Sequence, residues 1–261
     1  MRQGFVIPVY NHGSTLESVV SALVQYNLPI IVVDDGNDEE NKNFISQVSQ
    51  KHKNVSVITN KRNRGKGYSV CAAVKLAKKM EITHLFQIDA DGQHDTQSTC
   101  AEFLQASKDN PQALICGYPE FDSSVPAARL KARRISNNYT EFVTLSKGQI
   151  KDAMCGYRIY PVEPFYKICS RTWIDSHMGF DSEILARMIW ADVPVIYKGV
   201  RVTYPAEGKS NFRVVRDNIH ISFMFARLTV GMWLRYPWLK ARQIKRRKNS
   251  FEQNSTKEEA R

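Results

Sequence analysis

The chain has 261 residues, 43% of them hydrophobic, so it is long enough to bury the core of one large domain. Its 37 basic and 26 acidic residues give a formal net charge of +11, which favours anionic partners such as nucleotides or lipid headgroups. The five cysteines are scattered singly, so neither a disulfide framework nor a zinc site is indicated, and the pattern favours a reducing cytoplasm. Because the first apolar run begins at Gly4, we expect no signal peptide.

The first half of the chain alternates apolar runs with helical segments. We expect strands at 4–10, 29–33, 55–58, 83–88 and 113–117. Helices are expected at 14–26, in the segments that end at Gln50 and Met80, and at 96–107. Alternation with nearly continuous apolar strands predicts an α/β fold, a mostly parallel, Rossmann-like sheet covered by helices on both faces.

The second half is less regular. A basic helix is expected at 126–147, a short strand near 159–160, a helix from 179 to 190, and a strand at 193–197. The segment 217–238 is apolar but is interrupted by His220, Arg227 and Arg235, so we expect no membrane-spanning helix.

Polar side chains follow three of the expected strands. Tyr10 and Asn11 follow the first, Asp34 and Asp35 the second, and Asp89 with Asp91 the fourth. Ligands of parallel sheets bind outside the carboxyl ends of the strands, so these clusters predict one functional site.

The stretch "DADGQ" suits a metal ion. If the backbone stays extended to residue 93, Asp89, Asp91 and Gln93 point the same way and offer the oxygen ligands that Mg²⁺ or Mn²⁺ prefers. An EF-hand is excluded, because His94 and Cys100 stand where it needs Gly and Glu. Three alternatives stay open: a polar turn, a haloacid dehalogenase-like phosphatase with Asp89 as nucleophile, and a non-catalytic nucleotide- or lipid-binding protein.

Five motifs together resemble a known family. "IPVYN", "VVDDG", "NRGKG", "DADGQ" and "DAMCGYR" are similar, in order and spacing, to family 2 glycosyltransferases with the GT-A fold, and most to the dolichol-phosphate mannose synthase-like branch. The resemblance covers roughly residues 4–210. It implies a hexosyltransferase that moves a sugar, with inversion, from a nucleotide-diphosphate sugar to a lipid-linked acceptor such as a polyprenyl phosphate. It also implies a divalent metal, Mg²⁺ or Mn²⁺.

The same resemblance implies roles for individual residues. The nucleotide-sugar pocket would comprise Pro8, Tyr10, Asn11, Asp34, Asp35, Lys66 and Asp89. The metal ligands would be Asp89, Asp91 and Gln93, and the catalytic group Asp91, Arg158, Asp181 and Glu183. Asp181 would be the general base, unless an acceptor that is already an anion needs none. Arg133, Arg134, Lys209 and Arg213 would bind the acceptor phosphate, although Pro205 replaces an arginine that this branch usually carries.

The C-terminal segment has a pattern of its own. At helical spacing Ile221, Phe225, Leu228 and Met232 share one face, and Pro237 is expected to end the helix. A basic run, residues 240–248, follows without an acidic residue. We interpret the segment as a helix on an anionic membrane surface, the alternative being a helix docked on the core with a solvated tail. No signature of nucleic-acid binding accompanies it.

These inferences predict three regions. Residues 1–212 form the transferase domain, 213–248 the amphipathic and basic membrane-surface segment, and 249–261 a disordered tail. The expected location is cytoplasmic, at the inner face of the cytoplasmic membrane, where the enzyme would build a cell-envelope glycolipid.

Overall fold

The computed structural model describes residues 1–94, 96, 98–121, 125, 127–202 and 214–259, without the side chains of 127–129, 214–216 and 246–259. Its strands are β1 (Gln3–Val9), β2 (Ile30–Asp34), β3 (Val55–Thr59), β4 (His84–Gln87), β5 (Leu114–Glu120), β6 (Arg158–Pro161) and β7 (Val195–Arg201). Its α-helices are α1 (Gly13–Leu23), α2 (Glu39–Lys51), α3 (Lys66–Lys79), α4 (Cys100–Asp109), α5 (Ala127–Thr144), α6 (Val162–Arg171), α7 (Phe180–Trp190) and α8 (Val214–Glu259). A short 3₁₀ helix, Val24–Tyr26, continues α1 to the expected end. The helix expected from residue 96 begins only at Cys100.

The strands form one seven-stranded sheet in the order β3-β2-β1-β4-β6-β5-β7. Only β6 runs antiparallel to its neighbours among these strands. The predicted mostly parallel sheet is therefore confirmed. The order reverses between β1 and β4, and such a switch point is where sheets of this kind bind ligands.

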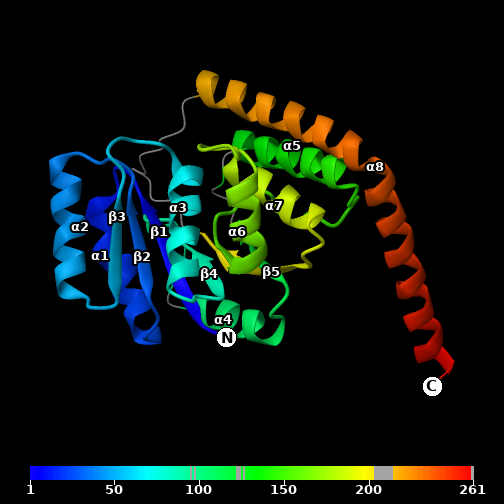
Figure 1. Ribbon diagram of the computed structural model, residues 1–261, viewed down its shortest axis with the longest axis horizontal. Coiled ribbons are helices and arrows are strands. Elements are labelled where there is room, and N and C mark those ends of the chain that lie inside the picture. The colour runs from blue at the N-terminus through cyan, green and yellow to red at the C-terminus, as the bar shows by residue number, and fades with distance from the viewer. Residues whose placement is uncertain (95, 97, 122–124, 126, 203–213, 260–261) are drawn as a thin grey trace.

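Side chains that alternate along the central strands supply two cores. Phe5, Ile7 and Val9 of β1 face a cluster built with α1, α2 and α4, whereas Val6 faces a cluster built with α3, α6 and α7. Helices thus cover both faces of the sheet (Figure 1). The apolar strand sequences follow from this arrangement, because a strand between two layers of helices meets no water.

A third layer consists of α5 and α8, which pack on α7 away from the sheet (Figure 1). Phe225, Leu228 and Met232 of α8 are buried in this cluster together with Val143 and Trp190. The apolar face expected to lie on a membrane is therefore the face that packs against the protein, as in the alternative of a helix docked on the core.

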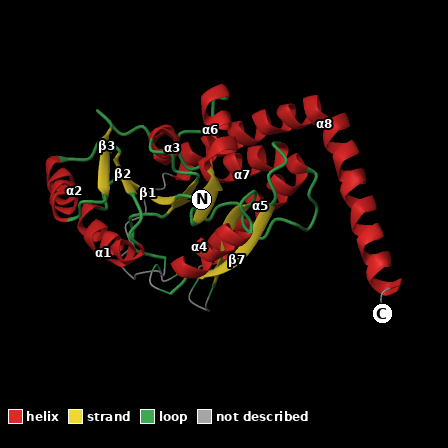
Figure 2. Cartoon of the chain, turned by 60° about the horizontal axis from the view of Figure 1, so that its bottom comes forward, coloured by secondary structure: helices red, strands yellow, loops and turns green. Residues whose placement is uncertain are grey.

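The prediction that Pro237 ends the helix is wrong. Pro237 lies inside α8, which continues to Glu259 and extends away from the rest of the chain (Figure 2). Contacts beyond the proline offset its missing backbone donor. Leu239 is buried, and the Arg242 guanidinium donates to the carbonyl oxygens of Trp190 and Ile189 at 3.1 and 2.7 Å. Within the part of the chain that is described, no helix is long and apolar enough to cross a membrane.

Candidate functional site

Lys66 connects two aspartates at the carboxyl edge of the sheet. It is the first residue of α3, and its Nζ lies 2.8 Å from Asp89 Oδ1 and 3.0 Å from Asp181 Oδ2. Asp89 follows β4, and Asp181 lies in the first turn of α7. The structure thus brings together three of the predicted site residues from three distant parts of the sequence.

The charges within this cluster determine which of its side chains are ionised. Burial alone would lower the pKa of Lys66, but the negative charges of Asp181 and Asp89 outweigh it and raise that pKa above its ordinary value. Burial would raise the pKa of Asp89, yet the charges of Lys66 and His94 leave it below the usual value. The pKa of Asp91 is raised, by burial and by the charge of Asp89. Asp89 is therefore the more strongly ionised of the two carboxylates.

The condition that the backbone stays extended through "DADGQ" is not met. Strand β4 ends at Gln87 and the chain turns at residues 90–92, where Gly92 adopts φ +70°. The Gln93 amide donates to Asp91 Oδ1 at 3.0 Å, as in the turns that aspartate favours. The turn reading of Asp-Gly is thus right for the backbone, and simple strand alternation does not align Asp89, Asp91 and Gln93.

The donor chemistry of this turn nevertheless fits a hard divalent ion. Among the described residues, no group of three or more His, Cys, Asp or Glu side chains is placed to hold a metal by itself. A magnesium-type site needs only one or two carboxylates, because substrate phosphates and water complete it. Asp89 and Asp91 supply two. Beside them, the buried Nδ1 of His94 has no hydrogen-bond partner in the described part of the chain, and the Nε2 of the same ring lies 4.0 Å from Asp89 Oδ2. A buried polar atom without a partner fits a site that binds a polar ligand.

Two site residues were not predicted from the sequence. Gln87 donates from Nε2 to Asp181 Oδ1 at 3.1 Å and fixes that carboxylate. Gly156 lies so close to the cluster that a Cβ there would meet Lys66 Nζ and come within 2.9 Å of Asp89 Oδ2. A polar residue inside the apolar run "LFQI" was the signal for Gln87, and the motif "DAMCGYR" contains Gly156.

The loop that contains Gly156 is held by two of the predicted arginines. Arg133 of α5 pairs with Asp152, whose other oxygen accepts from the Met154 and Cys155 amides at 2.8 and 2.6 Å. The fully buried Arg158 donates to the backbone oxygen of Ala153 at 2.9 Å and to that of Asp181. Both arginines thus support the loop in this structure, Arg158 from within the core.

The glycine-rich segment "NRGKG" owes its glycines to a close backbone contact. Gly65 has φ +91°, and a Cβ on it would collide with the Ser176 carbonyl of the α6–α7 loop. That carbonyl accepts from the Gly67 amide at 2.8 Å, and Asp35 accepts from the amides of Arg64 and Gly65 at 2.9 and 2.7 Å. In other glycine-rich loops such backbone amides bind a phosphate, whereas here they donate hydrogen bonds to oxygen atoms of the protein. Lys66 alone turns toward the cluster.

The structure also describes the other residues predicted for the nucleotide-sugar pocket. Asp34, which is buried, accepts from the backbone and side-chain nitrogens of Asn37 at 3.0 and 2.7 Å. Pro8 is the next-to-last residue of β1, and Tyr10 and Asn11 follow that strand at the same edge. Pro8 and Tyr10 are partly buried, and Asn11 is exposed.

Glu183 and Arg134 are not in the cluster. Glu183 is fully buried and paired with Arg187 and Arg227, both at 2.6 Å, and Arg134 is exposed on α5. Lys209 and Arg213 lie outside the described residues.

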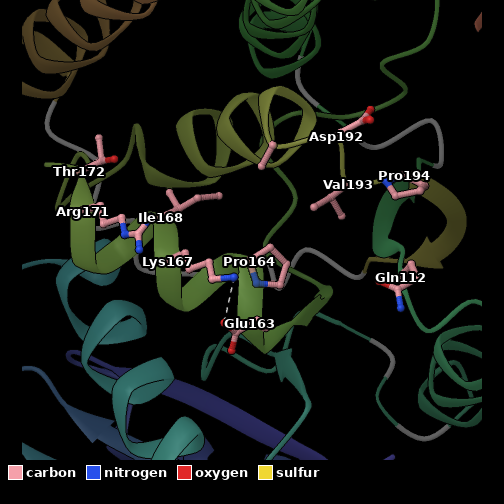
Figure 3. Close-up of a pocket in the computed structure, with 11 residues that line it drawn as sticks. Gln112, Glu163, Pro164, Lys167, Ile168, Arg171, Thr172, Asp192, Val193 and Pro194 are labelled. Carbon is pink, nitrogen blue, oxygen red and sulfur yellow. Dashed lines mark ion pairs between the residues drawn. The ribbon is translucent and has the colours of Figure 1, made fainter. Parts of the chain in front are cut away.

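A separate hollow of about 660 Å³ lies beside α6 (Figure 3). Its lining includes Gln112, two residues before β5, and Pro194, which directly precedes β7, so it lies at the amino ends of those strands. It contains none of the predicted site residues and belongs to the opposite edge of the sheet.

The chain is similar in sequence to proteins named as sugar transferases. The chain is 24% identical over 222 residues to the dolichyl-phosphate beta-glucosyltransferase ALG5C of Trichomonas vaginalis, which covers 73% of this chain and 62% of that protein. It is 23% identical over 173 residues to a UDP-N-acetylglucosamine–dolichyl-phosphate N-acetylglucosaminyltransferase of Methanococcus voltae, covering 59% of this chain and 67% of that one.

A solved structure shares the fold. The mannosyltransferase PcManGT of Pyrobaculum calidifontis, in complex with GDP-Man and Mn²⁺, superposes with a TM-score of 0.58 at 14% identity, covering 91% of this chain and 71% of that chain. The family model for glycosyl transferase family 2 matches residues 5–169, which include Lys66, Asp89 and Gly156. The chain belongs to glycosyl transferase family 2.

Proposed function

We propose that this glycosyltransferase moves a sugar, with inversion, from a nucleotide-diphosphate sugar to a lipid-linked acceptor, using a divalent metal. The observation that carries the proposal is the convergence of Lys66, Asp89 and Asp181 at the switch point of the sheet, with Asp91 in the next turn. Two relatives whose names specify dolichyl-phosphate sugar transfer support the class of acceptor. The neighbour that binds GDP-Man and Mn²⁺ supports the class of donor and the metal.

The side chains of the cluster suit this chemistry. Breaking the bond to the anomeric carbon leaves negative charge on a nucleoside diphosphate, which a positioned lysine such as Lys66 stabilises. Asp89 and Asp91 would hold the divalent ion, with Gln93 at the same turn, and such an ion stabilises the same charge as a Lewis acid. Asp181, which accepts a hydrogen bond from Gln87, would be the general base if the acceptor needs one.

The proposed binding site for the acceptor phosphate consists of positively charged side chains. Arg133 and Arg134 on α5, with Lys209 and Arg213, would face the acceptor phosphate. The enzyme would work at the inner face of the cytoplasmic membrane, attracted to anionic lipid by its net charge of +11, with no nucleic-acid partner. The division into a catalytic domain, a membrane segment from residue 213 and a tail from 249 belongs to the same proposal.

Metal-dependent binding of the product tests this function. We expect Asp91→Ala to retain the melting temperature while calorimetry shows loss of the Mn²⁺-dependent gain in nucleoside-diphosphate affinity. Asp109→Ala, an exposed aspartate at the end of α4, is the matched control and should behave as wild type. Equal affinities of Asp91→Ala and wild type, with and without Mn²⁺, would exclude Asp91 as a metal ligand.

The reaction products separate the proposal from a phosphatase. Incubation with donor and polyprenyl phosphate should release nucleoside diphosphate in step with glycolipid. Fast release of inorganic phosphate from a phosphomonoester, with an acyl-phosphate trapped on Asp89, would overturn the proposal.

A further inference from the structure

Helix α8 has a second apolar stripe, on the face opposite the one that is packed. The inner stripe, Met224, Phe225, Leu228, Met232 and Leu239, is buried against α5 and α7. The outer stripe consists of Ile219, Phe223, Val230, Trp233 and Leu234, whose exposed fractions are 61–79%. At about 100° per residue, the five outer residues fall on the side of the helix opposite the inner stripe.

This pattern is unusual for a helix at a protein surface. Such a helix needs one apolar face toward the core and a polar face toward water. A single exposed leucine is ordinary, but five large apolar side chains aligned over about four turns make a continuous patch, and patches of this kind mark contact surfaces. The inner stripe already accounts for the packing of α8, so the outer stripe requires a partner outside the described fold.

The neighbouring helix α5 also carries exposed apolar side chains. Leu130, Ile135, Tyr139 and Phe142 of α5 are 44–52% exposed. Tyr139 also contacts Phe225 of α8, with ring centroids 4.6 Å apart, so the two helices lie side by side (Figure 1). Through Arg133 and its partner Asp152, α5 is in turn connected to the loop beside Lys66. The helix on which α8 packs is therefore joined by an ion pair to the loop that contains Gly156.

The charges beside the outer stripe favour one kind of partner. No acidic residue occurs between Asp217 and Glu252. Arg227 and Arg242 are engaged by the protein, whereas Lys240 and Lys245 are exposed and fall on either flank of the outer stripe. Lysines beside an apolar stripe complement an anionic bilayer, which offers phosphates above an apolar layer. A second copy of the chain would instead bring like charges together.

We propose that the outer stripe of α8 docks on an anionic lipid surface, with Trp233 and Leu234 entering its apolar layer. The biological role of this contact rests on the proposed function, because a lipid-linked acceptor is presented at such a surface. The contact itself requires neither donor nor acceptor, so it can be measured separately from sugar transfer.

Tryptophan fluorescence tests the docking face directly. The chain has four tryptophans, of which Trp190 is buried and Trp173, Trp233 and Trp238 are exposed. The variant W173F/W238F keeps Trp233 as its exposed tryptophan, and the matched control W233F/W238F keeps Trp173, which is 62% exposed on the α6–α7 loop. Both retain Trp190 as a common background.

Vesicles of phosphatidylglycerol brominated in the acyl chains should quench the first variant and leave the control unquenched. Vesicles of phosphatidylcholine, or high salt, should abolish the effect because the electrostatic attraction is absent or screened. Leu234→Asp, with an unchanged circular dichroism spectrum, should weaken sedimentation with anionic vesicles at least tenfold.

Two outcomes would overturn the inference. One is vesicle binding without quenching of Trp233, which would assign the contact to another surface. The other is a dimer in sedimentation velocity that Leu234→Asp dissociates and anionic vesicles do not, which would assign the stripe to a second copy. Intact quenching with no sugar transfer would instead count against the proposed function and leave the docking surface standing.

Discussion

Replacing Arg227 with methionine tests whether Glu183 is a buried counter-ion or a residue that meets the acceptor. Arg227 reaches from α8 to α7, where its Nη2 lies 2.6 Å from Glu183 Oε2. Its Nη1 donates to the backbone oxygen of Trp173 at 2.7 Å, and the guanidinium lies over the Trp173 ring at 4.2 Å. Methionine keeps an apolar stem but removes the charge and both hydrogen bonds.

The expected loss of stability follows from these contacts. Breaking a buried ion pair by removing one partner costs about 3–5 kcal/mol, because the other charge remains buried. Glu183 is fully buried, but it would keep Arg187 at 2.6 Å and the Asp175 amide at 2.8 Å. We therefore expect a smaller loss, about 2–3 kcal/mol, which for a chain of this size lowers the melting temperature by about 4–12 °C.

Thermal unfolding by circular dichroism measures this effect, with Arg235→Met as control. Arg235 is an exposed arginine of the same helix that donates to its own helix at Gly231 and lies 5.1 Å from the Trp190 ring. Its replacement should cost less than about 1 kcal/mol. A double-mutant cycle of Arg227→Met with Glu183→Gln should give a coupling above about 1 kcal/mol.

Equal melting temperatures for Arg227→Met and Arg235→Met would refute the counter-ion role. A Glu183→Gln variant of full stability with weakened acceptor binding would instead support the catalytic role that the family resemblance implies.

Three further changes probe other parts of the structure. Gly156→Ala should displace Lys66, because the new Cβ would meet its Nζ, and weaken nucleoside-diphosphate binding at least about tenfold (1.4 kcal/mol) in calorimetry. The raised pKa of Asp91 means that its carboxyl stays protonated to higher pH than an ordinary aspartate, so Mn²⁺ affinity should fall on acidification above the usual aspartate range, and Asp91→Asn should abolish that step. Cys71 and Cys169, whose sulfurs lie 2.8 Å apart, should form an intramolecular disulfide with the thiol oxidant diamide, measured as a loss of two hydrogens by mass spectrometry, and Cys71→Ser should prevent it.

The sheet was predictable because its signal is local. Apolar runs that end in polar residues indicated buried strands with a common functional edge, and at that edge Asp34 is the last residue of β2 and Asp89 follows β4. The position of β6 was not predictable. A short run such as Ile159-Tyr160 carries no information on direction, and its antiparallel place between β4 and β5 depends on long-range pairing.

The sequence predicted which residues form the site, but not which of them contact one another. Lys66, Asp89 and Asp181 were each singled out, yet the sequence offers no rule that places a lysine between two aspartates 92 residues apart. The extended backbone assumed for "DADGQ" does not form for a local reason, because Gly92 adopts a positive φ and turns the chain. The close approach of Gly65 to the Ser176 carbonyl was not predictable either, because the two residues are far apart in the sequence.

Helix α8 shows why periodicity alone cannot assign a face. Both the stripe through Phe225 and the stripe through Trp233 repeat at helical spacing, so the sequence supports either one as the lipid-facing side. The choice depends on what lies opposite each stripe. Trp190 and Val143 cover the first, and burial there removes it from any contact with lipid. If α8 binds a bilayer, it therefore does so through the second stripe, with Lys240 and Lys245 of the basic run on the flanks of that stripe.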